Sequence, residues 1–151
     1  MALKTISQNR KAHHDYHIKD SVEAGLVLTG TEIKSIRAGK VSLRDTYAKP
    51  EGGDLWLMNA HIAPYEQGNR YNHEPDRRRK LLLHREQIVH FSNEVLKKGN
   101  SLVPLRLYLK NGIAKVELGL ARGKKTHDKR QSLIQRETER DMAHAVKLRR
   151  I

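Results

Sequence analysis

The sequence contains no cysteine, one tryptophan, one phenylalanine and no long run of apolar residues. Without cysteine the chain has no disulfide framework, no thiolate zinc site and no nucleophilic thiol. Its apolar stretches fall short of the roughly 20 residues that a transmembrane helix needs, and the first residues carry no apolar signal segment. These absences predict a soluble cytoplasmic protein.

Basic residues are in large excess. The 151 residues include 30 Lys and Arg against 17 Asp and Glu, a formal net charge of +13. This excess indicates a polyanionic partner, either nucleic acid or an anionic membrane. A membrane-binding helix needs Trp, Phe and Leu on one face, whereas Trp56 and Phe91 lie in different segments. Nucleic acid is therefore favoured, and no membrane partner is expected. Because the five Tyr are scattered, backbone contact with a folded RNA is favoured over a single-strand stacking platform.

Residues 102–121 show the clearest local pattern. Apolar and polar residues alternate on both sides of Asn111-Gly112, the preferred pair for a two-residue type I′ turn. The outer face of such a hairpin pairs Arg106 with Glu117. Its inner face pairs only apolar residues: Leu109–Ala114, Leu107–Val116, Leu105–Leu118 and Val103–Leu120.

Other elements are shorter. We expect strands over residues 16–18, 23–30, 41–47 and 55–62. The apolar face of the last strand is expected to hold Trp56, Met58, Ala60 and Ile62. A short helix is expected from Thr31 as N-cap to Gly39, and a longer helix over residues 85–98. The longer helix buries Ile88, Phe91 and Val95.

This spacing predicts a mainly β protein. Short strands with two or three short flanking helices indicate a small closed antiparallel barrel over residues 1–121, either OB-type or SH3-like. Residues 122–151 differ, because they hold ten Lys or Arg against four Asp or Glu, and residues 135–141 contain nothing apolar. Such a segment cannot dock stably on a core, so we expect a basic C-terminal tail that is disordered in the free protein.

No catalytic, metal or cofactor site is indicated. Nine His are present, among them His13, His14 and His17, but there is no HExxH motif and no second ligand cluster. Imidazoles that face solvent or RNA are therefore favoured over metal ligands. P-loop, nucleophile-elbow and dinucleotide glycine motifs are also lacking. We expect neither an enzyme nor a bound cofactor.

Three basic groups are candidates for RNA contact. Lys34 and Arg37 share the short helix with Glu32, where a solvated helix face explains them equally well. Residues 77–80 are four consecutive cations. A solvated cluster is the alternative here, but we expect phosphate to relieve the repulsion between the four charges. Residues 122–130 form the densest cationic stretch, and we expect RNA contact there rather than a purely solubilising role.

Five sequence strings, in this order and spacing, resemble the bacterial SsrA-binding protein family, also called small protein B. They are NRKAHHDYHI, EAGLVLTGTEIKSIRAGKVSL, RRRKLLLH, LVPLRLY and GLARGKKTHDKR. The resemblance runs from about residue 6 into the tail. It implies an OB-type barrel that binds transfer-messenger RNA and brings it to ribosomes stalled on truncated messages, in trans-translation, without being an enzyme.

The resemblance also implies roles for individual residues. The barrel is expected to hold the tRNA-like half of the RNA near its elbow, in place of the missing anticodon arm. The RNA-binding residues implied by position are Asn9, Lys11, Tyr16, Glu32, Lys34, Arg37, Lys80, Leu82, Lys124 and Lys125. The tail is expected to become helical in the empty mRNA channel of the ribosome. Its implied decoding-centre residues are Gly123, His127, Asp128, Lys129 and Arg130.

Two other functions stay open on the sequence. A structural or assembly protein that binds ribosomal RNA shares the barrel, the charge and the tail. A metal-dependent RNA hydrolase predicts turnover that EDTA stops, although the sequence offers it no site. We expect the protein to act as a monomer.

Overall fold

The computed structural model describes residues 3–65 and 72–123. Its elements along the chain are β1 (Leu3–Gln8), α1 (Arg10–Asp15), β2 (Tyr16–Leu26), α2 (Gly30–Arg37), β3 (Val41–Ser42), β4 (Tyr47–Glu51), β5 (Asp54–Met58), β6 (His61–Ile62), β7 (Arg79–Leu82), α3 (Arg85–Val95), β8 (Asn100–Lys110) and β9 (Ile113–Gly123).

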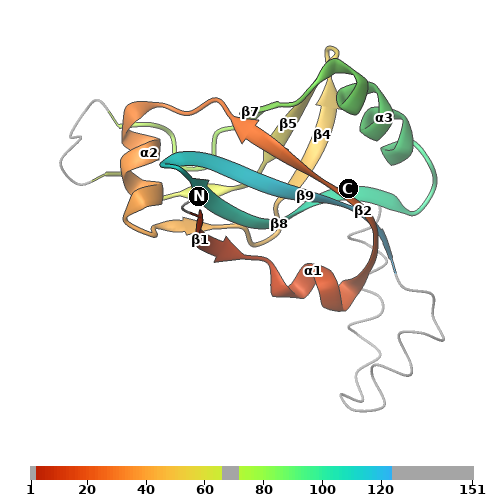
Figure 1. Ribbon diagram of the computed structural model, residues 1–151, viewed down its shortest axis with the longest axis horizontal. Helices are drawn as coiled ribbons and strands as arrows, with labels where there is room; N and C mark the ends of the chain where they lie inside the picture. Colours follow the sequence, from red (N-terminus) through yellow and green to blue (C-terminus); the bar gives the residue numbers. More distant parts are fainter. Residues whose placement is uncertain (1–2, 66–71, 124–151) are drawn as a thin grey trace.

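The main sheet closes on itself. Its strands follow the order β1-β8-β4-β5-β7-β2-β9, and β8 also pairs with β9, so that β8, β4, β5, β7, β2 and β9 form a ring to which β1 is added. In Figure 1, α2 lies at the left of the barrel, α3 at the upper right and α1 below it. This confirms the mainly β, OB-type closed antiparallel barrel with short flanking helices. β2 runs as one strand, where two had been expected.

Aliphatic side chains fill the barrel. Ile36 of α2 and Phe91 of α3 join the same core and are 0% and 3% exposed. Their burial anchors both helices, because removing a large apolar side chain from water contributes about 1.5–3 kcal/mol. The fully buried leucines and valine of the strands are Leu55, Leu57, Leu81, Leu102, Leu107, Val116 and Leu118.

The β8–β9 hairpin has the predicted turn. Asn111 and Gly112 have φ angles of 52° and 80°, the left-handed values that a type I′ turn requires at both positions. Next to the turn the register is also as predicted, since Leu107 lies opposite Val116. Farther along, Arg106 Nε donates to Glu117 Oε1 at 3.1 Å, which confirms the outward pair.

Beyond Arg106 the predicted hairpin register is wrong by one residue. A β-bulge places Pro104, rather than Leu105, opposite Leu118, and Leu102, rather than Val103, opposite Leu120. The extra residue in one strand reverses the face that the following residues take. Val103 and Leu105 therefore pack outside the barrel, in a second cluster with Ala12, Tyr16 and Ala121.

Two other predicted strands are each divided. Residues 41–47 and 55–62 contain Asp45 and Asn59, with φ angles of 56° and 68°, which turn the chain between β3 and β4 and between β5 and β6. The predicted apolar face of β5 is wrong, because Leu55 and Leu57 are buried while Trp56 is half-buried on the other face. The turn at Asn59 shifts the alternation of buried and exposed residues by one position. Ala60 and Ile62 are therefore buried in the core, as expected.

The helices begin and end near their predicted positions. The N-cap of α2 is Thr29, not Thr31: the Thr29 hydroxyl accepts from the Glu32 N–H at 3.3 Å, and the Glu32 carboxylate accepts from the Thr29 N–H at 2.8 Å. This reciprocal pair is a capping box. The helix is followed by Gly39, with φ of 77°. Phe91 of α3 is buried as expected, although the helix ends at Val95 rather than at residue 98.

Candidate RNA-binding surfaces

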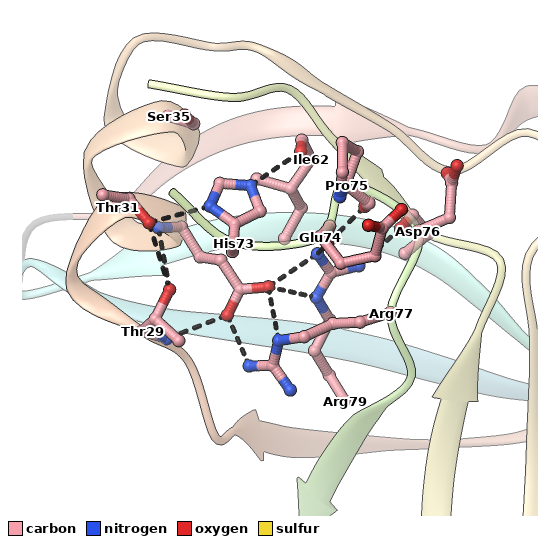
Figure 2. Close-up of polar contacts among 12 residues, drawn as sticks. Thr29, Thr31, Ser35, Ile62, His73, Glu74, Pro75, Asp76, Arg77 and Arg79 are labelled. Carbon is pink, nitrogen blue, oxygen red and sulfur yellow. Dashed lines mark hydrogen bonds and ion pairs between the residues drawn. The ribbon is translucent and has the colours of Figure 1, made fainter. Parts of the chain in front are cut away.

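Glu32 lies at the centre of a buried ionic cluster, and Figure 2 labels its partners Thr29, Arg77 and Arg79. Its side chain is 0% exposed. Oε1 accepts from Arg77 Nη2 at 2.5 Å, and Oε2 accepts from Arg77 Nε at 3.0 Å and from Arg79 Nε at 2.6 Å. We call Thr29, Glu32, Arg77 and Arg79 the Glu32 cluster. The resemblance implied that Glu32 either hydrogen-bonds RNA groups or orients a cation, and in the structure its carboxylate faces two arginines inside the protein.

Arg79 is also completely buried, and each of its three guanidinium nitrogens donates a hydrogen bond. Besides Glu32, its guanidinium donates to the carbonyl oxygens of Ala60 at 2.5 Å, Pro75 at 3.0 Å and Glu74 at 3.4 Å. A buried charge is stable only when it is paired and hydrogen-bonded. The sequence offered no sign of this pairing, since Arg79 lies 47 residues from Glu32.

Both charges of the buried pair persist at neutral pH. Burial raises the pKa of Glu32, but the hydrogen bonds from Arg77, Thr29 and Arg79 outweigh it, so the pKa of Glu32 is lowered below its ordinary value. Burial lowers the pKa of Arg79, and the Glu32 carboxylate opposes that shift. Because an arginine guanidinium keeps its proton in proteins, Arg79 stays charged.

Polar contacts fasten α2 to the segment around β6. The Thr31 hydroxyl contacts His73 Nδ1 at 2.8 Å, and His73 Nε2 contacts the Ile62 carbonyl oxygen at 2.8 Å. Ser35 Oγ donates to the Ala63 carbonyl at 2.7 Å. Together with the Glu32 cluster, these bonds fix the helix against the barrel; Figure 2 shows the contacts from Thr31 to His73 and from His73 to Ile62. The orientation of its outer face is therefore set by buried groups.

The four consecutive cations of residues 77–80 do not need phosphate to relieve their repulsion. Arg77 and Arg79 share Glu32, Arg78 Nη1 lies 3.0 Å from Glu51 Oε2, and Lys80 Nζ lies 3.7 Å from an Asp54 carboxylate oxygen. The expectation of a phosphate-dependent cluster is wrong, because each cation has a carboxylate partner from another element. Arg78 also stacks over Trp56, with Cζ 4.1 Å from the ring centroid.

The outer face of α2 carries exposed cations. Lys34 and Arg37 are exposed, on the face away from the buried Glu32, Ser35 and Ile36. The Lys34 ammonium lies 5.4 Å from the centroid of the Tyr65 ring. We call Lys34, Arg37 and the exposed Lys40 the α2 surface. Cations held on a fixed helix are suited to contact the phosphates of a folded RNA.

Exposed basic residues also lie around α1. Arg10 and Lys11 are exposed in the helix, and His17 and Arg122 are exposed where β2 pairs with β9. We call these residues the α1 surface. In Figure 1, α1 and α2 lie at different parts of the barrel, so the residues implied for RNA binding form two surfaces rather than one.

Two residues implied for RNA binding support α1 from inside. The Asn9 side chain caps the helix by accepting from the Ala12 N–H at 3.3 Å, and it donates to the Pro104 carbonyl at 3.0 Å. Tyr16 is 7% exposed and packs in the cluster outside the barrel. Of the three residues implied in this region, Lys11 has its side chain on the surface.

The remaining implied residues lie on β7, on β9 and beyond. The Lys80 side chain is 42% exposed and Leu82 is 51% exposed. Gly123 is the last residue of β9, pairs with Tyr16 and is buried, so the strand runs two residues past the expected domain boundary. Six implied residues lie outside the described residues: Lys124, Lys125, His127, Asp128, Lys129 and Arg130.

Neither a metal site nor a membrane span is found in the described part of the chain. Residues 3–65 and 72–123 contain no group of three or more His, Cys, Asp or Glu placed to hold a metal ion. Across the same residues, no helix is long and apolar enough to cross a bilayer.

Known relatives match almost the whole chain. The chain is 55% identical over 146 residues to the SsrA-binding protein of Carboxydothermus hydrogenoformans, covering 97% of this chain and 98% of the relative. It is 58% identical over 146 residues to the SsrA-binding protein of Geobacillus kaustophilus, covering 97% and 94%.

A solved structure and a family model agree with these relatives. A chain in the structure described as "tmRNA-SmpB: a journey to the center of the bacterial ribosome" matches with a TM-score of 0.69 and 46% identity, over 95% of each chain. The model of the SmpB protein family matches residues 6–148. The chain belongs to the SmpB protein family, a family of RNA-binding proteins.

Proposed function

We propose that this protein binds transfer-messenger RNA and delivers it to stalled ribosomes in trans-translation. The observation that carries the proposal is the identity of 55% and 58% with two SsrA-binding proteins over 97% of the chain. The similar solved chain comes from a structure of tmRNA and SmpB in the ribosome. The partners are therefore transfer-messenger RNA, through its tRNA-like domain, and the ribosome.

The α2 surface is the first contact that we assign to the RNA. Lys34 and Arg37 contact phosphates near the elbow of the tRNA-like domain, and Lys80 and Leu82 extend this contact along β7. Glu32 acts as a positioning residue: by holding Arg77 and Arg79 it fixes the angle of α2, and so the place of the cations outside. Glu32 therefore affects RNA binding through the position of α2, without touching the RNA itself.

The α1 surface is the second contact. Lys11 contacts the RNA backbone, while Asn9 and Tyr16 hold the helix that presents it. Affinity from such phosphate contacts falls steeply as salt rises. Two separated basic surfaces on a rigid barrel suit a folded RNA, which is recognised by shape more than by base sequence.

Residues 122–151 form the segment that we assign to the ribosome. Its ten Lys and Arg suit a channel walled by ribosomal RNA. Gly123, Lys124 and Lys125 begin the segment, and His127, Asp128, Lys129 and Arg130 lie at the decoding centre. We assign to this segment a disordered state in the free protein and a helical state in the mRNA channel. The free energy of ordering it is then offset by channel contacts, which are available only where the channel is empty.

The protein acts as a binding adaptor in the cytoplasm and not as an enzyme. The support for this part of the proposal is the RNA-binding family to which the chain belongs. The alternative is a structural or assembly protein that binds ribosomal RNA, and the binding experiment below separates the two.

A salt-titrated gel shift tests the proposed function. The full chain is titrated against the tRNA-like half of transfer-messenger RNA, with elongator tRNA and ribosomal RNA as competitors. We expect tight binding that persists in excess ribosomal RNA and weakens when Lys34 and Arg37 are changed to Gln. Indiscriminate binding that vanishes at modest salt would instead support the ribosomal-RNA alternative.

A further inference from the structure

The outer face of β4, β5 and β7 carries a row of three side chains. Lys49 lies opposite Trp56, and Trp56 lies opposite Lys80. Residues directly opposite each other in a sheet point to the same face, and Leu57, the next residue of β5, is buried inside the barrel. The row therefore faces outward, where Lys49 is exposed and the other two side chains are half-buried.

Arg78 lies over the indole of this row in a geometry that Glu51 holds. The guanidinium carbon is 4.1 Å from the ring centroid of Trp56. Glu51 fixes both groups, because its carbonyl oxygen accepts from Trp56 Nε1 at 3.2 Å and its carboxylate accepts from Arg78 Nη1 at 3.0 Å. The Arg78 side chain is still 46% exposed, so a ligand can reach the guanidinium from solvent. We call Lys49, Trp56, Arg78 and Lys80 the Trp56 surface.

A guanidinium held over an aromatic ring suits an unpaired RNA base. Bases that leave an RNA helix stack on aromatic rings and on guanidinium planes, and a base that lies on Arg78 adds one layer to the stack with Trp56. Neighbouring strands are about 4.8 Å apart, so the backbones of Lys49 and Lys80 are separated by about 10 Å, with the indole between them. Their flexible side chains can therefore contact phosphates on both sides of one nucleotide.

The carboxylates beside the Trp56 surface do not oppose such a contact. Glu51 pairs with Arg78, and Asp54 lies 3.7 Å from Lys80 Nζ; the two acidic side chains are 51% and 33% exposed. Ion pairs this exposed contribute little to stability, so Lys80 can turn from Asp54 to a phosphate at small cost. Lys49 is a third cation against these two carboxylates, and the Trp56 surface therefore attracts a polyanion.

We propose that the Trp56 surface binds one unpaired nucleotide of RNA, with the base stacked on Arg78 and the phosphates near Lys49 and Lys80. This inference rests on the proposed function, because it names a further contact of the same RNA-binding barrel. The Trp56 surface continues the contact assigned to β7, since Lys80 belongs to both. The nucleotide comes either from transfer-messenger RNA or from ribosomal RNA.

The emission of Trp56 gives the first test. Trp56 is the single tryptophan of the chain, so its fluorescence reports on this surface alone. The full-length protein is titrated with the tRNA-like half of transfer-messenger RNA and, separately, with protein-free small-subunit ribosomal RNA, neither of which adds a tryptophan. We expect quenching in one of the two titrations, with half-saturation at the concentration that a gel shift gives. Unchanged emission in both, where the gel shift shows binding, would overturn the proposal.

Arg78 variants test the stacking itself. By gel shift, Arg78→Gln and Trp56→Leu should each weaken binding of the same RNA by about fivefold to tenfold. Arg78→Lys keeps the charge but lacks the planar guanidinium, so it should bind as weakly as Arg78→Gln. Wild-type affinity in Arg78→Lys would overturn the stacked base, because a phosphate contact alone is then sufficient.

Arg106→Gln is the matched control. Arg106 also lies over an aromatic ring, 4.5 Å from the centroid of Tyr108, and pairs with Glu117 at 3.1 Å, but it is on β8 and outside the Trp56 surface. We expect no change in affinity for either RNA. Arg106→Gln and Arg78→Gln should melt at similar temperatures, because each loses one partly exposed ion pair.

The inference fails if Arg78→Gln binds both RNAs within about twofold of the wild type. It also fails if Arg106→Gln weakens binding as much as Arg78→Gln, because the effect then comes from the charge of the whole barrel. If Trp56→Leu does not fold, the Arg78 variants decide the matter. Failure of the proposed function is distinct, since it appears as a wild-type protein that does not prefer the tRNA-like RNA over its competitors.

Discussion

Replacing Glu32 tests whether the buried cluster holds α2 in place. Glu32→Ala leaves the Arg79 guanidinium, which is 0% exposed, without its carboxylate. Removing one partner of a buried ion pair costs about 3–5 kcal/mol, because the remaining charge is left uncompensated. For a domain of this size the loss corresponds to a fall in melting temperature of roughly 10–20 °C. Calorimetry or denaturant unfolding measures it directly.

Glu117→Ala is the matched control. Glu117 pairs with Arg106 at 3.1 Å, but the two side chains are 32% and 34% exposed. A partly exposed pair of this kind contributes at most about 1 kcal/mol. If Glu32→Ala destabilises the protein no more than Glu117→Ala, the Glu32 cluster does not hold the fold and the positioning role assigned to Glu32 is refuted.

The pH dependence of Glu32→Gln gives an independent check. The folded protein lowers the pKa of Glu32 below its ordinary 4.5, so this carboxylate contributes stability that is present above the unfolded pKa and lost as pH falls through the folded one. Glu32→Gln should therefore be less stable than the wild type at neutral pH, and the gap should narrow as pH falls below 4.5. A gap that stays constant into acid would contradict the ionic origin of the effect.

Three further predictions concern other parts of the barrel. Changing Lys34 and Arg37 together to Gln should reduce the slope of log affinity against log salt by about 1–2 in the gel shift with the tRNA-like RNA, and an unchanged slope would remove the α2 surface from the RNA interface. Burial and the hydrogen bond to Glu23 raise the pKa of Tyr108, so phenolate absorbance should show one tyrosine that stays protonated after the others have ionised. Gly119→Ala, a substitution on β9, should destabilise the fold by about 1–3 kcal/mol, because the added Cβ would lie 2.9 Å from a Leu105 side-chain carbon at the β8 bulge. An unfolding midpoint equal to that of the wild type would contradict this close packing.

Local patterns in the sequence were sufficient for the turn and the strands beside it. Asn111-Gly112 predicted the hairpin, because the residues that adopt the left-handed backbone of a type I′ turn are few. The bulge at Leu105 left no comparable signal. Leu102, Val103 and Leu105 are all apolar, so alternation alone cannot tell which of them face the barrel and which face α1.

The divided strands were missed for a related reason. Asp45 and Asn59 adopt positive φ. A glycine at either position would have predicted a turn, but Asp and Asn also tolerate this conformation and are a weaker signal. The turn after Met58 also explains why the wrong face of β5 was predicted to be buried. The buried residues Ala60 and Ile62 follow that turn, so their spacing does not extend back to Trp56 and Met58. Trp56 was assigned inward, whereas it lies outside the barrel and stacks with Arg78.

The sequence suggested candidate site residues but not the contacts that hold them in place. The residues around Glu32 were singled out by resemblance, and Lys34 and Arg37 do lie on the surface. The partners of Glu32 lie 45 and 47 residues away, and long-range ion pairs leave no periodic trace in the chain. The run at residues 77–80 was misread for the same reason, because the paired carboxylates come from α2, β4 and β5.

The measurement that tests the central claim most directly is peptide tagging in a reconstituted translation system stalled on a truncated message. It compares the full chain with a chain ending at Lys125, each supplied with transfer-messenger RNA, and records RNA affinity beside tagging. We expect the full chain to support tagging, and the shortened chain to keep its RNA affinity while losing tagging. A full chain that binds the RNA but supports no tagging, or a shortened chain that loses both activities equally, would contradict the division between an RNA-binding barrel and a ribosome-binding tail.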